Sequence, residues 1–152
     1  MKKEYELLAE QMRAVLEKEW PRVSNLSNAA GVLYQGIERI NWAGFYLLDE
    51  GVLWLGPFQG KPACVRIEAG KGVCGTAVSE GRTQLVYDVH QFPGHIACDS
   101  ASRSEIVIPL RKNGSIVGVL DIDSPELGRF EEQDQEGLEY IAGIIEKVIW
   151  VK

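Results

Sequence analysis

The sequence predicts an α+β fold in which helices pack on an antiparallel sheet, and three observations support this. Apolar residues recur at helical spacing near both ends of the chain, paired β-type segments with tight turns fill its middle, and no repeat or linker divides it. The chain has 152 residues, 45% of them hydrophobic and 25% charged, which is typical of one compact domain. We therefore expect one domain over residues 1–152, with N-terminal helices at 3–38, a sheet and its loops at 40–124, and a C-terminal helix at 131–150.

Two helices are expected before the sheet and one after it. Apolar residues such as Tyr5 and Met12 predict an amphipathic helix over 3–19, which Pro21 ends. A second helix is expected from Ser24, as its N-cap, through residue 37. The last helix runs from about 131 to 150 and buries an apolar stripe, which consists of Leu138, Ile141, Ala142, Ile145, Val148 and Ile149.

The segments between these helices predict a sheet of about six strands. Residues 41–48 and 52–58 form a hairpin, 64–67 a short third strand, and 83–86 a fourth. A glycine-rich turn at 69–72 leads into a short helix that starts near Val73 and ends before Gly81. Residues 87–103 have no regular period and are rich in His, Asp and Cys, as expected of a functional loop.

The last two strands, at 104–111 and 115–124, can pair in two registers. A two-residue turn at Asn113-Gly114 mixes polar and apolar residues on both faces of the hairpin. A three-residue loop with a bulge at Gly114 pairs Glu105 with Asp121 and separates apolar from polar residues better. We therefore predict the bulged register, which gathers Glu105, Asp121 and Asp123 at one end of one face.

The charge of the chain excludes some classes of partner. With 16 Lys and Arg against 22 Asp and Glu the net charge is −6, which disfavours binding to nucleic acid or to anionic lipid. Residues 1–20 are too charged for a secretory signal, and no apolar stretch approaches the roughly 20 residues of a membrane span. We expect a cytoplasmic protein.

The three cysteines are a first indication of chemistry, because structural disulfides are rare in a reducing compartment. Cys98 lies in the irregular loop, where an exposed thiol can act as a nucleophile or redox centre, and Cys64 would be its resolving partner if the loop folds over that edge. Cys74 is expected to be a buried apolar thiol. A metal centre of His90, His95 and Cys98 is an alternative, although no zinc-finger spacing supports it.

Aromatic and acidic side chains outline a pocket. Trp42 and Tyr46 share one face of the first strand, and Trp54 and Phe58 are placed likewise on the second, so these rings either wall a pocket or simply pack in the core. Carboxylates crowded within about 6 Å cannot all ionise easily, so one of them has a raised pKa or a cation lies between them. The alternative is a solvated hairpin end.

Five segments together resemble the free methionine-(R)-sulfoxide reductases, which are stand-alone GAF domains. They are NWAGFY at 41–46, GPFQG at 56–60, GKGVCG at 70–75, DVHQFPGHIACD at 88–99 and SRSEIVIP at 102–109. The resemblance covers roughly residues 26 to 150. It implies a six-stranded antiparallel sheet flanked by helices, homodimers, and thioredoxin-dependent reduction of the free amino acid sulfoxide.

The resemblance also implies roles for particular residues. The nucleophile falls on Cys98, the resolving thiol on Cys64, and a possible secondary thiol on Cys74. The resemblance implies no metal and no bound cofactor, since electrons come from NADPH through thioredoxin reductase and thioredoxin. Substrate-binding positions fall on Trp42, Tyr46, Glu105, Asp121 and Asp123.

Two other classes of function remain open at this point. GAF domains often bind cyclic nucleotides or other small ligands as sensors, and such a protein would turn nothing over. A metal-binding redox sensor would carry stoichiometric zinc after purification.

Overall fold

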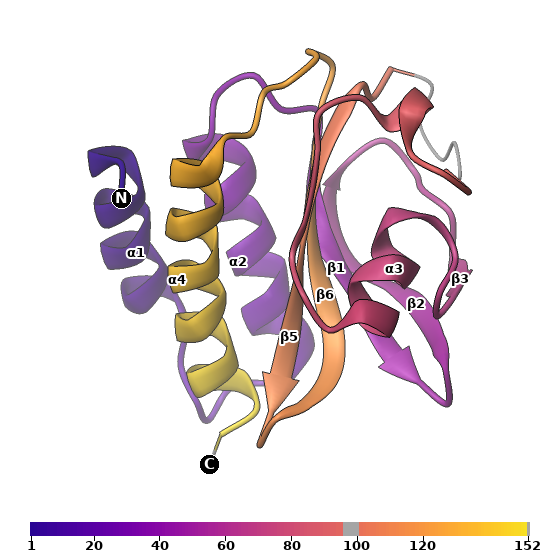
Figure 1. Cartoon of the computed structure of the whole chain (residues 1–152). Helices are drawn as coiled ribbons and strands as arrows, with labels where there is room; N and C mark the ends of the chain where they lie inside the picture. The colour runs from indigo at the N-terminus through magenta and orange to yellow at the C-terminus, as the bar shows by residue number, and fades with distance from the viewer. Residues whose placement is uncertain (96–100, 152) are drawn as a thin grey trace.

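The computed structural model of the chain, which describes residues 1–95 and 101–151, is built on a six-stranded sheet (Figure 1). All paired strands are antiparallel, and their order is β3-β2-β1-β6-β5-β4. This confirms the predicted α+β fold. The strands are β1 (Trp42–Asp49), β2 (Val52–Gly60), β3 (Arg66–Glu68), β4 (Gln84–Val86), β5 (Ser104–Lys112) and β6 (Ser115–Ser124).

Helices cover both faces of the sheet (Figure 1). Helices α2 (Arg22–Gly36) and α4 (Glu132–Ile149) lie on one face, and α1 (Lys3–Val15) packs on both of them. The other face carries α3 (Gly72–Glu80), and the short 3₁₀ helix η1 (Val89–Gln91) follows β4. In the described part of the chain, no helix has the length and apolar character that crossing a bilayer requires.

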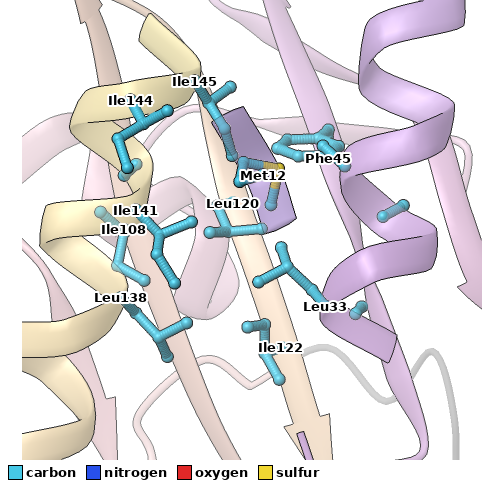
Figure 2. Close-up of a cluster of buried hydrophobic side chains, with 14 of the residues drawn as sticks. Met12, Leu33, Phe45, Ile108, Leu120, Ile122, Leu138, Ile141, Ile144 and Ile145 are labelled. Atoms are coloured by element: carbon cyan, nitrogen blue, oxygen red, sulfur yellow. The ribbon is translucent and has the colours of Figure 1, made fainter. Parts of the chain in front are cut away.

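The two faces of the sheet bury separate cores because side chains alternate along each strand. On the helical face, residues such as Ile108, Leu120 and Ile122 pack against the predicted apolar stripe of α4, which includes Leu138 and Ile141 (Figure 2). The opposite face buries a smaller cluster beneath α3, and this cluster contains Trp42, Tyr46, Val107 and Val119 together with Cys74.

The first two helices differ from the prediction at their ends. Helix α1 stops at Val15 rather than at 19, because Leu16 is extended and the Asn25 side chain binds both the amide and the carbonyl of Glu17, at 3.1 and 2.8 Å. Helix α2 begins at Arg22, so the predicted N-cap, Ser24, lies inside the helix. Pro21 takes that position, and its carbonyl accepts a hydrogen bond from the Ser24 amide at 3.1 Å.

The hairpin of β5 and β6 adopts neither of the two registers considered from the sequence. Lys112 pairs with Ser115 across a two-residue turn, in which Asn113 and Gly114 have φ of 51° and 83°. Positive φ at both positions is characteristic of the tight hairpin turn that the prediction rejected. A bulge between Leu110 and Arg111 then shifts the pairing further along the strands.

The bulge explains why the predicted faces are correct although the predicted register is wrong. Glu105 pairs with Asp123 and Val107 with Asp121, which is a shift of two residues from the predicted pairs. A shift of two leaves every side chain on its face, so all three acidic residues still share one end of one face. At the bulge the face differs from the prediction: Val117, which the pairing of β5 with β6 skips, packs against the helical core and was expected on the other side.

A buried polar network connects α1 to the start of α4. Asp134 is fully buried and accepts hydrogen bonds from the Tyr5 hydroxyl at 2.7 Å, Lys2 Nζ at 3.1 Å and the Glu131 amide at 2.8 Å. The buried guanidinium of Arg129 lies 3.6 Å away. Burial raises the pKa of Asp134, but these hydrogen bonds outweigh burial, so its pKa is lowered and it stays ionised.

Replacing Asp134 by alanine is expected to reduce the free energy of unfolding by about 3 kcal/mol, because the substitution removes the carboxylate from a buried ion pair. Urea unfolding at neutral pH measures the change. The control is Glu136→Ala. The Glu136 side chain is 65% exposed and pairs with the N-terminus, so its removal is expected to reduce the free energy of unfolding by about 0.5 kcal/mol or less. Equal losses in the two variants would contradict a special role for the buried network.

Candidate active site

A cavity of about 50 Å³ lies on the face of the sheet that α3 covers. It brings together residues that are far apart in the sequence: strands β1, β5 and β6 supply the predicted substrate-binding residues, and α3 supplies a cysteine. The predicted site residues that line it are Trp42, Tyr46, Cys74, Glu105, Asp121 and Asp123. Cys98, the predicted nucleophile, lies outside the described residues.

Two aromatic rings from β1 form one wall of the cavity. Trp42 and Tyr46 are buried, and their ring centroids lie 6.0 Å apart with 25° between the ring planes. Phe58 stacks on Trp42 at 5.2 Å. Position 44, between Trp42 and Tyr46 in the sequence, must be glycine, because a Cβ there would lie 2.3 Å from Phe58 Cβ.

Trp54 takes neither of the two places considered from the sequence, the pocket wall or the core. Trp54 is 43% exposed, and the Arg66 guanidinium lies 6.0 Å from its ring centroid. The pairing of β1 with β2 shifts by one residue between Gly44 and Tyr46, so Phe58 and Trp54 face opposite sides of the sheet. The four-residue spacing of Trp54 and Phe58 in the sequence gives no indication of this register shift.

The same aromatic side chains hold the segment that contains Cys64. The Tyr46 hydroxyl donates to the Cys64 carbonyl at 2.8 Å, and Trp42 Nε1 donates to the Lys61 carbonyl at 3.0 Å. Cys64 is half-buried and disulfide-bonded. It precedes β3, which starts at Arg66 rather than at the predicted residue 64.

The acidic residues form a buried cluster with the third cysteine. Glu105 and Asp121 are only 7% and 6% exposed, while Asp123 is half-buried. Donor atoms of Cys74, Glu105 and Asp121 all lie within 4.8 Å of one another. The expected burial of Cys74 in an apolar cluster is confirmed, and its thiol also lies beside the carboxyl groups of Glu105 and Asp121, which the sequence did not predict.

Burial shifts the pKa values of this cluster upward. It raises the pKa of Glu105 well above its ordinary value, and the nearby Asp121 and Asp123 raise it further. Burial also raises the pKa of Asp121, although hydrogen bonds with Glu105 and Cys74 oppose the rise. The Cys74 thiol has a raised pKa because of burial and then because of Asp121 and Glu105. These shifts favour the carboxylic acid form of Glu105 and the thiol form of Cys74.

His95 and Ser102 also line the cavity, and neither was predicted as a substrate-site residue. Burial lowers the pKa of His95, and so does His90, whose ring lies 6.1 Å away, which makes neutral imidazole the favoured form. Ser102 is buried and accepts a hydrogen bond from Asn41 Nδ2 at 3.3 Å. The sequence signal for His95 was its place in the irregular loop, where it was considered as a metal ligand.

Replacing Glu105 by glutamine is expected to raise the melting temperature more at pH 9 than at pH 5. A carboxyl whose folded-state pKa is raised contributes stability below its unfolded pKa of about 4.5, and this contribution is lost as the pH rises through the folded-state pKa. Glutamine mimics the protonated form at every pH. Thermal unfolding at both pH values, with the exposed Glu10→Gln as control, measures the difference. The same change in melting temperature at pH 5 and pH 9 would contradict the raised pKa.

Comparisons with known proteins show which proteins this chain is similar to. Residues 24–149 match the model of a GAF domain family. The chain is 51% identical over 145 residues to the free methionine-R-sulfoxide reductase of Escherichia coli K12, covering 95% of this chain and 88% of the relative.

Solved structures give the same result. The fRMsr of Staphylococcus aureus in complex with substrate superposes with a TM-score of 0.91 at 56% identity, covering 95% of each chain. The free methionine-R-sulfoxide reductase of Neisseria meningitidis in complex with its substrate has a TM-score of 0.91 at 46% identity, covering 97% of this chain and 90% of that one.

Proposed function

The chain belongs to the GAF domain family and, within it, to the free methionine-R-sulfoxide reductases, and we propose that it reduces free L-methionine-(R)-sulfoxide to L-methionine. The observation that carries this proposal is the buried cluster of Glu105 and Asp121 beside the ring pair of Trp42 and Tyr46. The cluster can supply both a proton donor and a site for a cation, and the rings offer an apolar surface to an S-methyl group.

Substrate selection follows from charge. The carboxyl groups of Asp121 and Asp123 would bind the ammonium group of a free amino acid. A methionine within a peptide offers an uncharged amide nitrogen instead, and it would leave buried carboxyl groups without a cation. An acid on one side of the pocket and rings on another would accept one sulfoxide epimer.

The first step uses the raised pKa of Glu105. Protonation of the sulfoxide oxygen makes the sulfur electrophilic, and Glu105 is the acid we assign to this role because its pKa is raised by burial and by two neighbouring carboxyl groups. The Cys98 thiolate then attacks that sulfur. The S–O bond breaks with loss of water, and Cys98 is left bonded to the methionine sulfur as a sulfonium adduct. A water molecule then attacks the Cys98 sulfur, the S–S bond breaks, methionine departs with the electron pair, and Cys98 is left as a sulfenic acid.

The second step restores the thiols. The Cys98 sulfenic acid condenses with the Cys64 thiol, which gives a disulfide and one water molecule. Thioredoxin reduces this disulfide by exchange and is itself reduced by NADPH through thioredoxin reductase. A disulfide at Cys64 and the two hydrogen bonds that hold its segment over the pocket support this assignment.

The surroundings of the reaction are also part of the proposal. We propose that it needs no bound metal or cofactor, since a thiol, an acid and an external dithiol complete the cycle. The reducing cytoplasm supplies the thioredoxin. A homodimer is the assembly that the family resemblance implies.

The proposal is tested by NADPH consumption with thioredoxin and thioredoxin reductase present. Free L-methionine-(R)-sulfoxide, its (S) epimer and an N-acetylated (R)-sulfoxide are offered in parallel. We expect turnover of the free (R) form alone. If fully reduced protein turns over none of them but binds a small ligand, the chain is a GAF-type sensor, for example of cyclic nucleotides, and the proposal is wrong.

A further inference from the structure

We infer that Cys74, Glu105 and Asp121 form a binding site for a thiophilic divalent metal such as Zn²⁺, and that metal bound there excludes the substrate. The metal is thus an inhibitor and not a resident cofactor. Binding of the metal does not depend on the proposed reaction, whereas its competition with substrate rests on the proposed substrate site.

The geometry of the three side chains supports the inference. They project from α3, β5 and β6, and their donor atoms lie within 4.8 Å of one another. In tetrahedral zinc sites with bonds of about 2.0–2.3 Å, neighbouring donors lie roughly 3–4 Å apart. Small side-chain rotations are therefore enough to bring one sulfur and two oxygens into a single coordination sphere.

A second observation points to a cationic ligand at this place. Asp121 is 94% buried, and its Oδ1 accepts no hydrogen bond from any described residue, although the side chain lines the cavity. A buried carboxylate oxygen without a donor is costly, and a cation in the cavity would satisfy it.

The donor types select the metal. Sulfur disfavours Mg²⁺ and Ca²⁺, which take oxygen ligands, whereas Zn²⁺ accepts sulfur, nitrogen and oxygen together. The imidazole of His95 lines the same cavity and is a candidate fourth ligand. This donor set differs from the His90, His95 and Cys98 centre considered from the sequence, because the fold places His95 at a cavity lined by carboxyl groups and Cys74.

The site has a direct functional consequence. Asp121 and Glu105 are the groups proposed to bind the substrate ammonium and to donate the proton. A metal ion on both carboxyl groups would occupy the ammonium position and remove the acid. Zn²⁺ is therefore expected to inhibit competitively with respect to the sulfoxide.

The test uses a Cys64→Ser/Cys98→Ser background, in which Cys74 is the single thiol of the chain. Co²⁺ serves as a spectroscopic probe, and Zn²⁺ is measured by equilibrium dialysis. We expect a thiolate-to-Co²⁺ charge-transfer band in the near ultraviolet, one Zn²⁺ bound per chain, and weaker Zn²⁺ binding when L-methionine is added. Adding Cys74→Ser should abolish the band and weaken Zn²⁺ binding by more than about tenfold.

Two further measurements allow for a variant that does not fold. Circular dichroism measures whether each variant is folded. If Cys74→Ser is unfolded, Asp121→Asn in the same background takes its place. A band that persists without Cys74, unchanged Zn²⁺ binding in Asp121→Asn, or no metal bound to the reduced background protein overturns the inference. Because the background lacks the proposed nucleophile and the readout is binding, failure to reduce methionine sulfoxide is a separate result.

Discussion

Replacing Cys98 by serine is expected to abolish methionine sulfoxide reduction, with a loss of at least about 10⁴-fold in kcat. A serine hydroxyl is not ionised near neutral pH and cannot form a sulfenic acid, so the first step has no nucleophile. The measurement is methionine formation by reduced protein, both in a single turnover without thioredoxin and at steady state with it.

The matched control is Cys64→Ser, which should separate the two halves of the cycle. This variant keeps the proposed nucleophile and should form about one methionine per chain in the absence of thioredoxin. Its sulfenic acid then lacks a resolving thiol, so steady-state turnover with thioredoxin should fall strongly, and dimedone should label Cys98. Full single-turnover activity in Cys98→Ser would show that another thiol is the nucleophile.

Replacing Glu105 by glutamine is expected to reduce kcat/KM by about 10²–10⁴-fold, which is the usual contribution of a positioned general acid. Glutamine retains the size of the side chain but cannot donate the proton that activates the sulfoxide. Because burial and two adjacent carboxyl groups raise the pKa of Glu105, the wild-type protein should lose activity as the pH rises through that pKa. The pH profile of kcat/KM measures this, and the variant should lack the descending limb.

Asp121→Asn is the control for this prediction, because Asp121 belongs to the same buried cluster but is assigned to the substrate ammonium. Its main effect should be a KM raised by about 10–100-fold, as expected when a hydrogen bond to a charged group is lost. If Glu105→Gln changed KM alone and kept the wild-type pH profile, Glu105 would be a binding residue and the acid would be another group.

The acidic hairpin shows how much of the site local sequence can predict. Alternation along 115–124 was enough to assign Asp121 and Asp123 to one face, because side chains alternate strictly along a strand. The assignment of Glu105 to that face depended on a predicted register, and it is correct because the observed pairing differs from that register by two residues. Alternation did not predict which residues these acidic residues pair with across the hairpin. The turn at Asn113-Gly114 and the bulge at Leu110 act together, and their combined shift of two residues preserves the faces while it changes every pair.

The second strand and Cys74 show where local reasoning fails. The spacing of Trp54 and Phe58 predicted a shared face, but a shift in the pairing of β1 with β2 separates them. Cys74 lies between Val73 and Gly75 in the sequence, so an apolar environment was the natural expectation. The structure brings it against Glu105 and Asp121, whose strands are about 30 or more positions away along the chain.

The sequence by itself determined the fold class, the approximate extents of the helices and strands, and the shared face of Asp121 and Asp123. These properties depend on the periodicity of neighbouring residues. Only the tertiary structure decided the strand register, the cluster of Cys74 with two carboxyl groups, the place of His95 at the cavity and the raised pKa of Glu105. Each of these arises from burial or pairing between segments that are distant in the chain, where a single irregularity such as a bulge changes which atoms meet.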